Sequence, residues 1–141
     1  MGRRLIVDTN ILIDIERNNH AVDALLTDDD ELAIAAVTRA EFRTGALITA
    51  DEQVRERRLV VAARILGALE CLHYDEDTAD IHAELLAYVR KSGLPRGAHD
   101  LIIAAHARQT GRQIQSRDAH ARFGDLPGVS VAAAIGHKSD T

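Results

Sequence analysis

Short apolar runs alternate with longer helical segments along this chain of 141 residues, and this alternation restricts its fold more than any other feature. Apolar runs at 4–7, 32–37 and 71–74 predict buried strands, and weaker patterns predict two more at 113–116 and 129–132. Helices are predicted over 10–18 and 21–26, from Thr38, from Asp51, after the cap Asp77-Thr78, and over 99–110 before Gly111. Strands joined by helical crossovers form mostly parallel sheets covered on both faces. We therefore expect an α/β fold with three layers and a mostly parallel sheet of four to five strands.

The length and composition predict a single folded domain. We place it at residues 1–135, followed by a flexible tail at 136–141. Hydrophobic residues make up 46% of the chain and no apolar run is long enough to span a membrane, so neither disorder throughout nor a membrane span is expected. Because Cys71 is the one cysteine, an internal disulfide and a cysteine-based zinc site are excluded. These features favour a reducing compartment, and we expect a cytoplasmic protein.

Four carboxylates lie just beyond predicted strand ends or at a helix start. Asp8 follows the first strand, Glu41 lies four residues after the second, and Asp118 lies two residues after the fourth. Asp100 lies in the first turn of the helix that begins at His99. Because the carboxyl ends of parallel strands meet at one edge of a sheet, we expect these side chains to converge there.

Each of these acids also has a purely structural explanation. Asp8 could cap the following helix, and Asp118 could stabilise a turn. Glu41 could complete a capping box with Thr38, and Asp100 gains from the dipole of its helix. One such coincidence is ordinary, but four of them at one sheet edge favour a shared purpose.

Clustered carboxylates repel one another unless a cation neutralises them. A site made of oxygen ligands, without cysteine or clustered histidine, suits Mg²⁺ or Mn²⁺. Such an ion lowers the pKa of bound water and polarises a phosphoryl oxygen. The residues therefore predict hydrolysis of phosphodiester bonds.

Charge is distributed unevenly along the chain, whose net charge is −5. Residues 1–85 carry a net −9, whereas residues 86–122 carry seven basic residues and two acidic ones. Within this basic stretch, Arg96, Arg117 and Arg122 are candidates for contacts with an RNA backbone, although a solvated face would explain them equally well. An aromatic content of 3% argues against a base-stacking platform. His99 and His106 share a helix with Asp100; they are candidates for proton donation or for a structural role.

Four segments in order carry a resemblance to a known family. They are Asp8-Thr9-Asn10 after an apolar strand, Thr38-Arg39-Ala40-Glu41-Phe42, His99-Asp100-Leu101-Ile102-Ile103-Ala104-Ala105, and Ser116-Arg117-Asp118 followed by Phe123 and Leu126-Pro127-Gly128-Val129. The chain resembles a PIN-domain ribonuclease from about residue 4 to residue 132. Its order and spacing are most similar to the VapC toxin of a bacterial VapBC toxin–antitoxin pair.

The resemblance implies a three-layer α/β/α PIN-like domain with endoribonuclease activity that leaves 5′-phosphate and 3′-hydroxyl ends. It implies that Asp8 and Asp100 are the firmest ligands of Mg²⁺ or Mn²⁺, and that Glu41 and Asp118 complete the acidic pocket or hold a second ion. It also implies that Thr9 or Ser116 positions the attacking water or a phosphate oxygen. The implied partners are an RNA substrate, a second copy in a homodimer, and a cognate VapB-type antitoxin in a larger assembly. No membrane partner is expected.

Three other functions remain open at this point. A housekeeping RNA-processing nuclease would need no antitoxin. A signalling receiver domain also gathers carboxylates around Mg²⁺, but it needs a lysine after a late strand, and the two lysines are Lys91 and Lys138. An inactive module that only binds partners would have little use for all four acids.

Overall fold

The computed structural model describes residues 2–18 and 29–132, which form a sheet with helices on both sides. The strands are β1 (Arg4–Val7), β2 (Glu31–Ala35), β3 (Glu70–Leu72) and β4 (Gln113–Gln115). The helices are α1 (Thr9–Arg17), α3 (Ala36–Leu47), α4 (Glu52–Gly67), α5 (Glu76–Ser92) and α6 (Ala98–Thr110), with 3₁₀ turns η1 (Ala119–Ala121) and η2 (Phe123–Asp125). None of the helices in these ranges is long and apolar enough to cross a membrane.

The four strands are all parallel and lie in the order β3-β2-β1-β4. Ile6 in the central strand β1 is aligned with Ala33 of β2 on one side and with Ile114 of β4 on the other. The predicted parallel sheet is therefore confirmed. The predicted fifth strand at 129–132 is reduced to one parallel bridge between Ile114 and Val131. The prediction of a full strand there was wrong, because two backbone hydrogen bonds to Ile114 are all that join this segment to β4.

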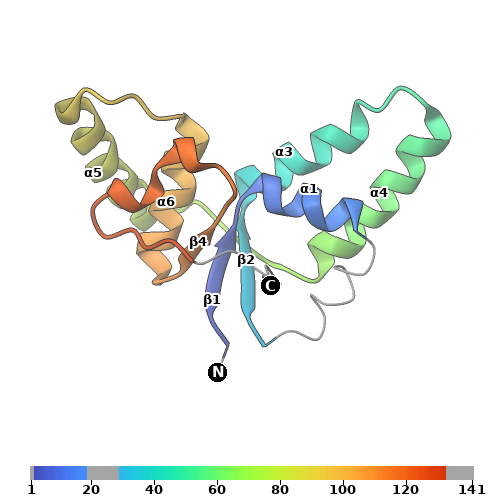
Figure 1. Ribbon diagram of the computed structural model, residues 1–141, viewed down its shortest axis with the longest axis horizontal. Coiled ribbons are helices and arrows are strands. Elements are labelled where there is room, and N and C mark those ends of the chain that lie inside the picture. Colours follow the sequence, from blue (N-terminus) through green and yellow to red (C-terminus); the bar gives the residue numbers. More distant parts are fainter. Residues whose placement is uncertain (1, 19–28, 133–141) are drawn as a thin grey trace, which may run out of the picture.

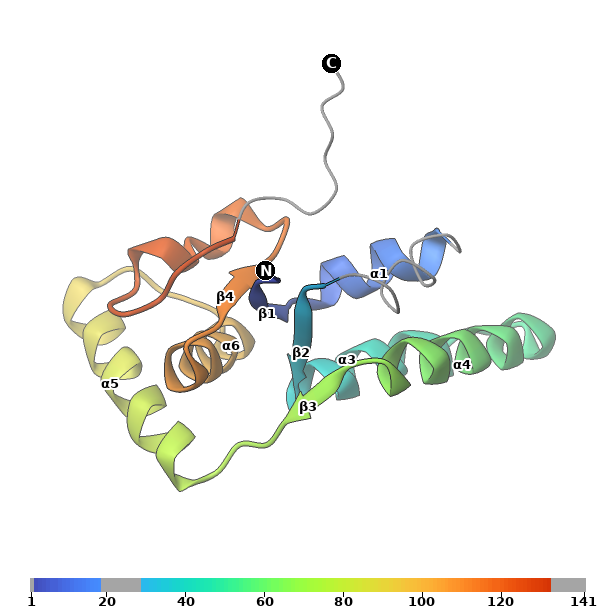
Figure 2. The same cartoon turned by 90° about the horizontal axis from the view of Figure 1, so that it is seen from below.

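The sheet separates two hydrophobic clusters, which gives the three expected layers. Alternate residues of a strand point to opposite faces. Ile6 and Ile114 accordingly pack with α5 and α6, whereas Val7 and Ile34 pack with α1, α3 and α4. Figures 1 and 2 show the two groups of helices on opposite sides of β1 and β2.

Two helix starts differ from the prediction. Helix α3 begins directly after β2 at Ala36, without a capping side chain, so residues 36–37 are helical and the predicted capping box is wrong. Thr38 lies inside the helix, fully buried, and its hydroxyl contacts His99 instead. The cap of α5 is Asp75 rather than Asp77-Thr78: Asp75 accepts from the Thr78 amide over 2.9 Å, and Thr78 Oγ1 accepts from the Asp75 amide over 3.2 Å.

Several other local predictions are confirmed. Asp51 caps α4 by accepting from the Val54 amide. Gly111 ends α6 with a φ of 70°, a left-handed conformation that glycine adopts without strain. The predicted inner face of α5 is buried or partly buried against the core: Ile81, Leu85, Leu86 and Val89. The predicted helix at 21–26 and the tail at 136–141 lie outside the described residues.

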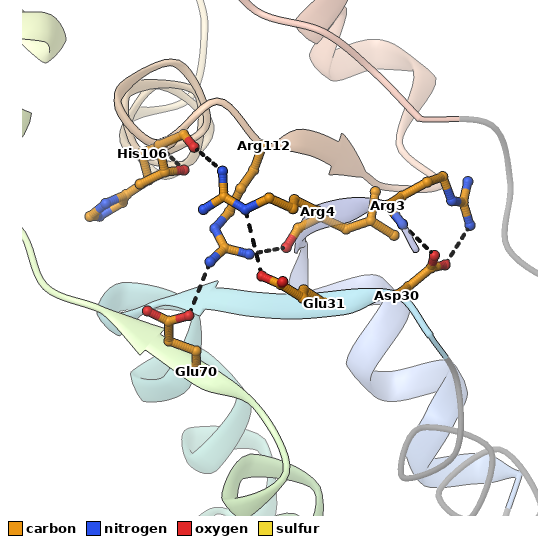
Figure 3. Close-up of polar contacts among 9 residues, drawn as sticks. Arg3, Arg4, Asp30, Glu31, Glu70, His106 and Arg112 are labelled. Atoms are coloured by element: carbon orange, nitrogen blue, oxygen red, sulfur yellow. Dashed lines mark hydrogen bonds and ion pairs between the residues drawn. The ribbon is translucent and has the colours of Figure 1, made fainter. Parts of the chain in front are cut away.

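Salt bridges close the amino-terminal edge of the sheet (Figure 3). The Arg112 guanidinium, whose side chain is 3% exposed, donates to the Leu5 carbonyl in β1 and to Glu70 in β3 over 3.0 Å. Arg4 donates to the Thr110 carbonyl and pairs with Glu31, and Arg3 pairs with Asp30 over 2.8 Å. This edge is therefore used for structure, and the carboxyl-terminal edge carries the candidate site.

Candidate active site

All four predicted acids lie at the carboxyl-terminal edge of the sheet. Asp8 follows β1 and is 7% exposed. Glu41 lies in the second turn of α3, and Asp118 precedes η1, two residues after Ser116. Asp100 lies in the first turn of α6, and Figure 1 shows that the chain enters α6 at the end of the sheet where β1 leads into α1.

The ionisation of Asp100 reflects this arrangement. Burial raises the pKa of the Asp100 carboxyl, and the negative charges of Asp8, Asp118 and Glu41 raise it further, while His99 opposes them. A like charge shifts a pKa in this way only when it lies close by. The other three acids therefore lie close enough to Asp100 for their charges to act on it.

Two hydroxyl groups form hydrogen bonds with the acids. Ser116 Oγ donates to Asp8 Oδ2 over 3.0 Å and accepts from the Asp118 amide over 3.0 Å. Thr9 Oγ1 donates to Glu41 Oε1 over 2.7 Å. Both hydroxyl protons are thus directed at carboxylates, and the hydroxyls fix the position of the acids.

Asn10 belongs to the same network, although no separate role was predicted for it. Its Nδ2 atom donates to Ser116 Oγ over 3.2 Å, and its Oδ1 atom accepts from the Arg117 amide over 3.1 Å. It therefore joins the start of α1 to the segment after β4. The signal in the sequence was an asparagine inside the first turn of a helix. Asparagine is unfavourable there, because its side chain competes for the backbone hydrogen bonds of the helix, unless that side chain has partners elsewhere in the fold.

Capping roles are present for Asp8 and Asp118 but not for Glu41. Asp8 does cap α1, accepting from the Thr9 amide over 2.7 Å, and Asp118 caps η1, accepting from the His120 amide over 3.0 Å. The capping explanation for Glu41 fails, since α3 begins five residues before it. Glu41 instead contacts two side chains from other elements, Thr9 and His99.

The chemistry of this donor set fits a hard divalent cation, because it consists of carboxylate oxygens whose charges repel one another. Across residues 2–18 and 29–132, however, no three or more histidine, cysteine, aspartate or glutamate side chains are gathered closely enough to hold an ion as they stand. Hydrogen bonds from Ser116 and Thr9 occupy oxygens of Asp8 and Glu41, and His99 Nδ1 lies within ion-pairing distance of Glu41. Binding of a shared ion would therefore bring the carboxylates closer together.

Arg96 has a structural role in place of the expected contact with RNA. Its side chain is 5% exposed, and Nη1 donates to the carbonyls of Ala121 over 2.6 Å and of Arg122 over 2.8 Å. A guanidinium held in this way stabilises the turns that follow Asp118 and is not accessible to a phosphate. The sequence could not reveal this, because an arginine that binds carbonyls and one that faces solvent look alike.

Arg117 and Arg122 remain accessible beside the acids. The Arg117 side chain is 58% exposed and pairs with Asp14 over 2.6 Å, and the Arg122 side chain is 42% exposed. Both line a pocket of about 250 Å³ that begins at Ser116 and Asp118 and has Phe123 and Val131 in its wall. A pocket with two cationic side chains next to carboxylates has the polarity that a phosphate ester needs.

His106 lies on the same helix as Asp100 but serves the core. It is 1% exposed, and its ring packs in a T-shaped arrangement against Tyr74 with the ring centroids 6.2 Å apart. Burial lowers the pKa of His106. The structural role considered for this residue is confirmed.

Comparison with known proteins places this arrangement in a family. The family model "PIN domain" matches residues 5–126. Ribonuclease VapC5 of Mycobacterium tuberculosis is 31% identical over 113 residues, which cover 80% of this chain and 82% of that protein. The tRNA(fMet)-specific endonuclease VapC of Salmonella typhimurium is 26% identical over 130 residues, 91% of this chain and 96% of that one.

Solved structures agree with this result. In the crystal structure of DNA-bound VapBC from Salmonella typhimurium, the matching chain superimposes with a TM-score of 0.79 at 26% identity, over 94% of this chain and 98% of that chain. PIN-domain nucleases are in general metal-dependent. The family model covers most of the chain, and a relative more than 30% identical is covered over most of its length. The chain therefore belongs to the PIN domain family, among the VapC-type ribonucleases.

Proposed function

We propose that residues 1–135 form an endoribonuclease domain whose cation, Mg²⁺ or Mn²⁺, is held by Asp8, Glu41, Asp100 and Asp118. The observation that carries this proposal is the placement of all four acids at the carboxyl-terminal edge of the sheet, where the charges of Asp8, Asp118 and Glu41 act on Asp100. Such repulsion destabilises the site unless a cation relieves it, and an RNA-cleaving site needs that cation to offset the charge of the phosphate.

The burial of each acid suggests a division of labour. Asp8 is buried and Asp100 half-buried, so their carboxylates are the most firmly placed and would be the principal ligands. Glu41 and Asp118 are exposed and would complete the site from its rim. When bound, the cation would lower the pKa of a water molecule and polarise a phosphoryl oxygen. Ser116 and Thr9 would hold Asp8 and Glu41 in place, and Thr9 or Ser116 would also position the attacking water or a phosphate oxygen.

The reaction is hydrolysis of a phosphodiester bond in RNA. A water oxygen bonds to phosphorus, the bond from phosphorus to the 3′ oxygen breaks, and that oxygen takes up a proton. The ends produced are a 5′-phosphate and a 3′-hydroxyl. Arg117 and Arg122 would contact the RNA backbone, because they are exposed and line the pocket next to Asp118. Such contacts orient RNA without reading its sequence.

The partner of this chain would be a cognate VapB-type antitoxin encoded beside it. This rests on its similarity to chains solved as toxin–antitoxin complexes, among them VapBC of Salmonella typhimurium and VapBC-5 of Mycobacterium tuberculosis. The chain would act in the cytoplasm, where its RNA substrate is found, as a homodimer within a larger assembly with the antitoxin. A toxin of this kind arrests growth when its antitoxin is missing.

Incubation of the purified protein with total RNA, followed by mapping of the cleaved ends, tests the enzymatic part. We expect 5′-phosphate ends in Mg²⁺ or Mn²⁺, no cleavage in EDTA, and no cleavage by D8N or D100N. Asp80 is an exposed aspartate on α5, away from the acids, so D80N is the matched control and should cleave like the wild type. Cleavage by D8N or D100N at the wild-type rate would refute the assignment of the site.

Expression of the chain alone and together with the small protein encoded next to it tests the biological part. Growth arrest relieved by that neighbour supports a toxin–antitoxin pair. Growth arrest that the neighbour does not relieve would be compatible with the proposed nuclease activity and would favour a housekeeping RNA-processing enzyme.

A further inference from the structure

His99 connects two helices at the rim of the acidic site. It lies in the first turn of α6, directly before Asp100, and its side chain is 20% exposed. Its Nδ1 atom lies 3.1 Å from Glu41 Oε2, and its Nε2 atom lies 3.3 Å from Thr38 Oγ1. One imidazole therefore binds two residues of α3 that are a single helical turn apart.

Of the four acids, Glu41 depends most on contacts that restrict the rotamers of its side chain. Its side chain is 53% exposed and has three rotatable bonds, so on a free helix surface it would sample many rotamers. Two side chains from two other elements contact it here: Thr9 Oγ1 donates to Oε1 over 2.7 Å, and His99 Nδ1 lies 3.1 Å from Oε2. These residues are the sequence neighbours of Asp8 and Asp100, so the Glu41 carboxylate is tied to the two acids assigned as principal ligands.

Thr38 fixes the orientation of the ring. It is fully buried in α3 and cannot exchange its partner for water. When Thr38 donates its hydroxyl proton to Nε2, the ring carries its hydrogen on Nδ1, which is the atom that faces Glu41. The ring is thus anchored at a buried end, and its partly exposed end faces the Glu41 carboxylate.

We propose that His99 is a positioning residue, which holds the Glu41 carboxylate at the rim of the acidic site so that Glu41 can complete the ligand set of the cation. This inference rests on the proposed function. It assigns to His99 an action through Glu41 and no contact with RNA or with the reacting atoms. Loss of the ring should therefore weaken binding of the cation and leave the affinity for RNA unchanged.

Binding of Mn²⁺ to the RNA-free protein, followed by electron paramagnetic resonance, tests this inference. In H99A we expect the affinity for Mn²⁺ to fall by about 10–100-fold, the usual effect of removing a residue that orients a ligand. H99N should restore most of the affinity, because an asparagine amide can donate from nearly the position of Nδ1. His73 is exposed and has no role in the site, so H73A is the matched control and should bind like the wild type.

A double-mutant cycle with E41A separates a positioning role from a structural one. If His99 acts through Glu41, H99A lowers the affinity for Mn²⁺ in the wild type but not further in the E41A background. Wild-type affinity in H99A, or an equal additional loss in H99A E41A, would overturn the inference. So would an H99N protein that is folded but as weak as H99A, since the ring itself would then be the ligand.

The cycle also distinguishes failure of this inference from failure of the proposed function. If E41A and D100N lose Mn²⁺ but H99A does not, the cation site stands and the role of His99 is refuted. If the wild type binds no Mn²⁺ and cleaves no RNA, the proposed function itself fails. Circular dichroism shows whether H99A is folded; if it is not, T38V takes its place, because it removes the anchor of the ring with little change of volume, and it should lower the affinity in the same direction.

Discussion

Ser116 Oγ donates a hydrogen bond to Asp8 Oδ2 over 3.0 Å, although the two residues are 108 positions apart in the sequence. The same oxygen accepts from the Asp118 amide, so a single hydroxyl links an acid after β1 to an acid after β4. This contact exists because β4 pairs directly with β1 in a parallel sheet. The geometry of the site is therefore a direct consequence of the strand order.

Removal of this hydroxyl should impair the reaction. In S116A the Asp8 carboxylate loses the donor that orients it, so we expect the rate of RNA cleavage to fall by about 10–100-fold. S116T retains the hydroxyl and should keep most of the activity. Initial rates on a labelled RNA at a fixed Mn²⁺ concentration check this, and an unchanged rate in S116A would show that Asp8 is held without Ser116.

Neutralisation of Asp100 should remove activity and increase stability. Its pKa is raised in the folded state, chiefly by burial and then by the charges of Asp8 and Asp118. The folded state therefore binds this proton more tightly than the unfolded state, and stability falls as the pH rises from the ordinary aspartate pKa through the raised one. D100N lacks this penalty and should melt at a higher temperature than the wild type at pH 7.

The pH dependence provides the check on that prediction. Thermal denaturation in the absence of divalent ions should show the largest gain for D100N at neutral pH, and the gain should disappear in acid, where Asp100 of the wild type is protonated. D100N should nevertheless show no detectable cleavage of RNA. A D100N protein that is less stable than the wild type at pH 7 would mean that the charges in the cluster do not repel in the ion-free protein.

The two groups of arginines should respond differently to salt. Arg117 is exposed and its proposed partner is a phosphate, so R117A should weaken RNA binding and reduce the slope of log K against log salt by about 0.7. R96A should leave this slope unchanged, because its guanidinium binds the carbonyls of Ala121 and Arg122. Filter binding in the inactive D100N background measures both, and equal slopes in R117A and the wild type would exclude Arg117 from the RNA interface.

The two partners of the ion pair at the opposite edge of the sheet, Glu70 and Arg112, should differ in how much their removal lowers the free energy of unfolding. In E70A the buried Arg112 guanidinium loses its carboxylate partner, so we expect the free energy of unfolding to fall by about 1–3 kcal/mol. R112M replaces the charge by an apolar side chain and leaves Glu70 in contact with water, so its loss should be smaller. Urea denaturation of the two variants compares them; a larger loss in R112M would mean that the stem of Arg112 matters more than its charge.

Most of the fold could be predicted because its signals are local. The strand before Asp8 and the glycine that ends α6 follow from apolar runs and from backbone conformation, and both were found. The start of α3 was missed because Thr38 and Glu41 imitate a capping box, whereas tertiary contacts with His99 decide what these side chains do. The fifth strand failed for a similar reason, since the pairing of Val131 with Ile114 extends over a single bridge.

The acids were predictable and their partners were not. A carboxylate after a buried strand is visible in the sequence, and the rule for parallel sheets places several of them together. The bonds of Arg96 and of Asn10 depend on which segments approach each other in space, over 25 and more than 100 residues. No pattern along the chain encodes such distances, so the supporting contacts of the site required the structure.

The pairing of β1 with β4 also makes the site depend on complete folding. Until residues 113–118 lie beside β1, Asp8 has neither Ser116 nor Asp118 as a neighbour. A chain whose β4 has detached therefore keeps every acid in its sequence and loses their arrangement in space.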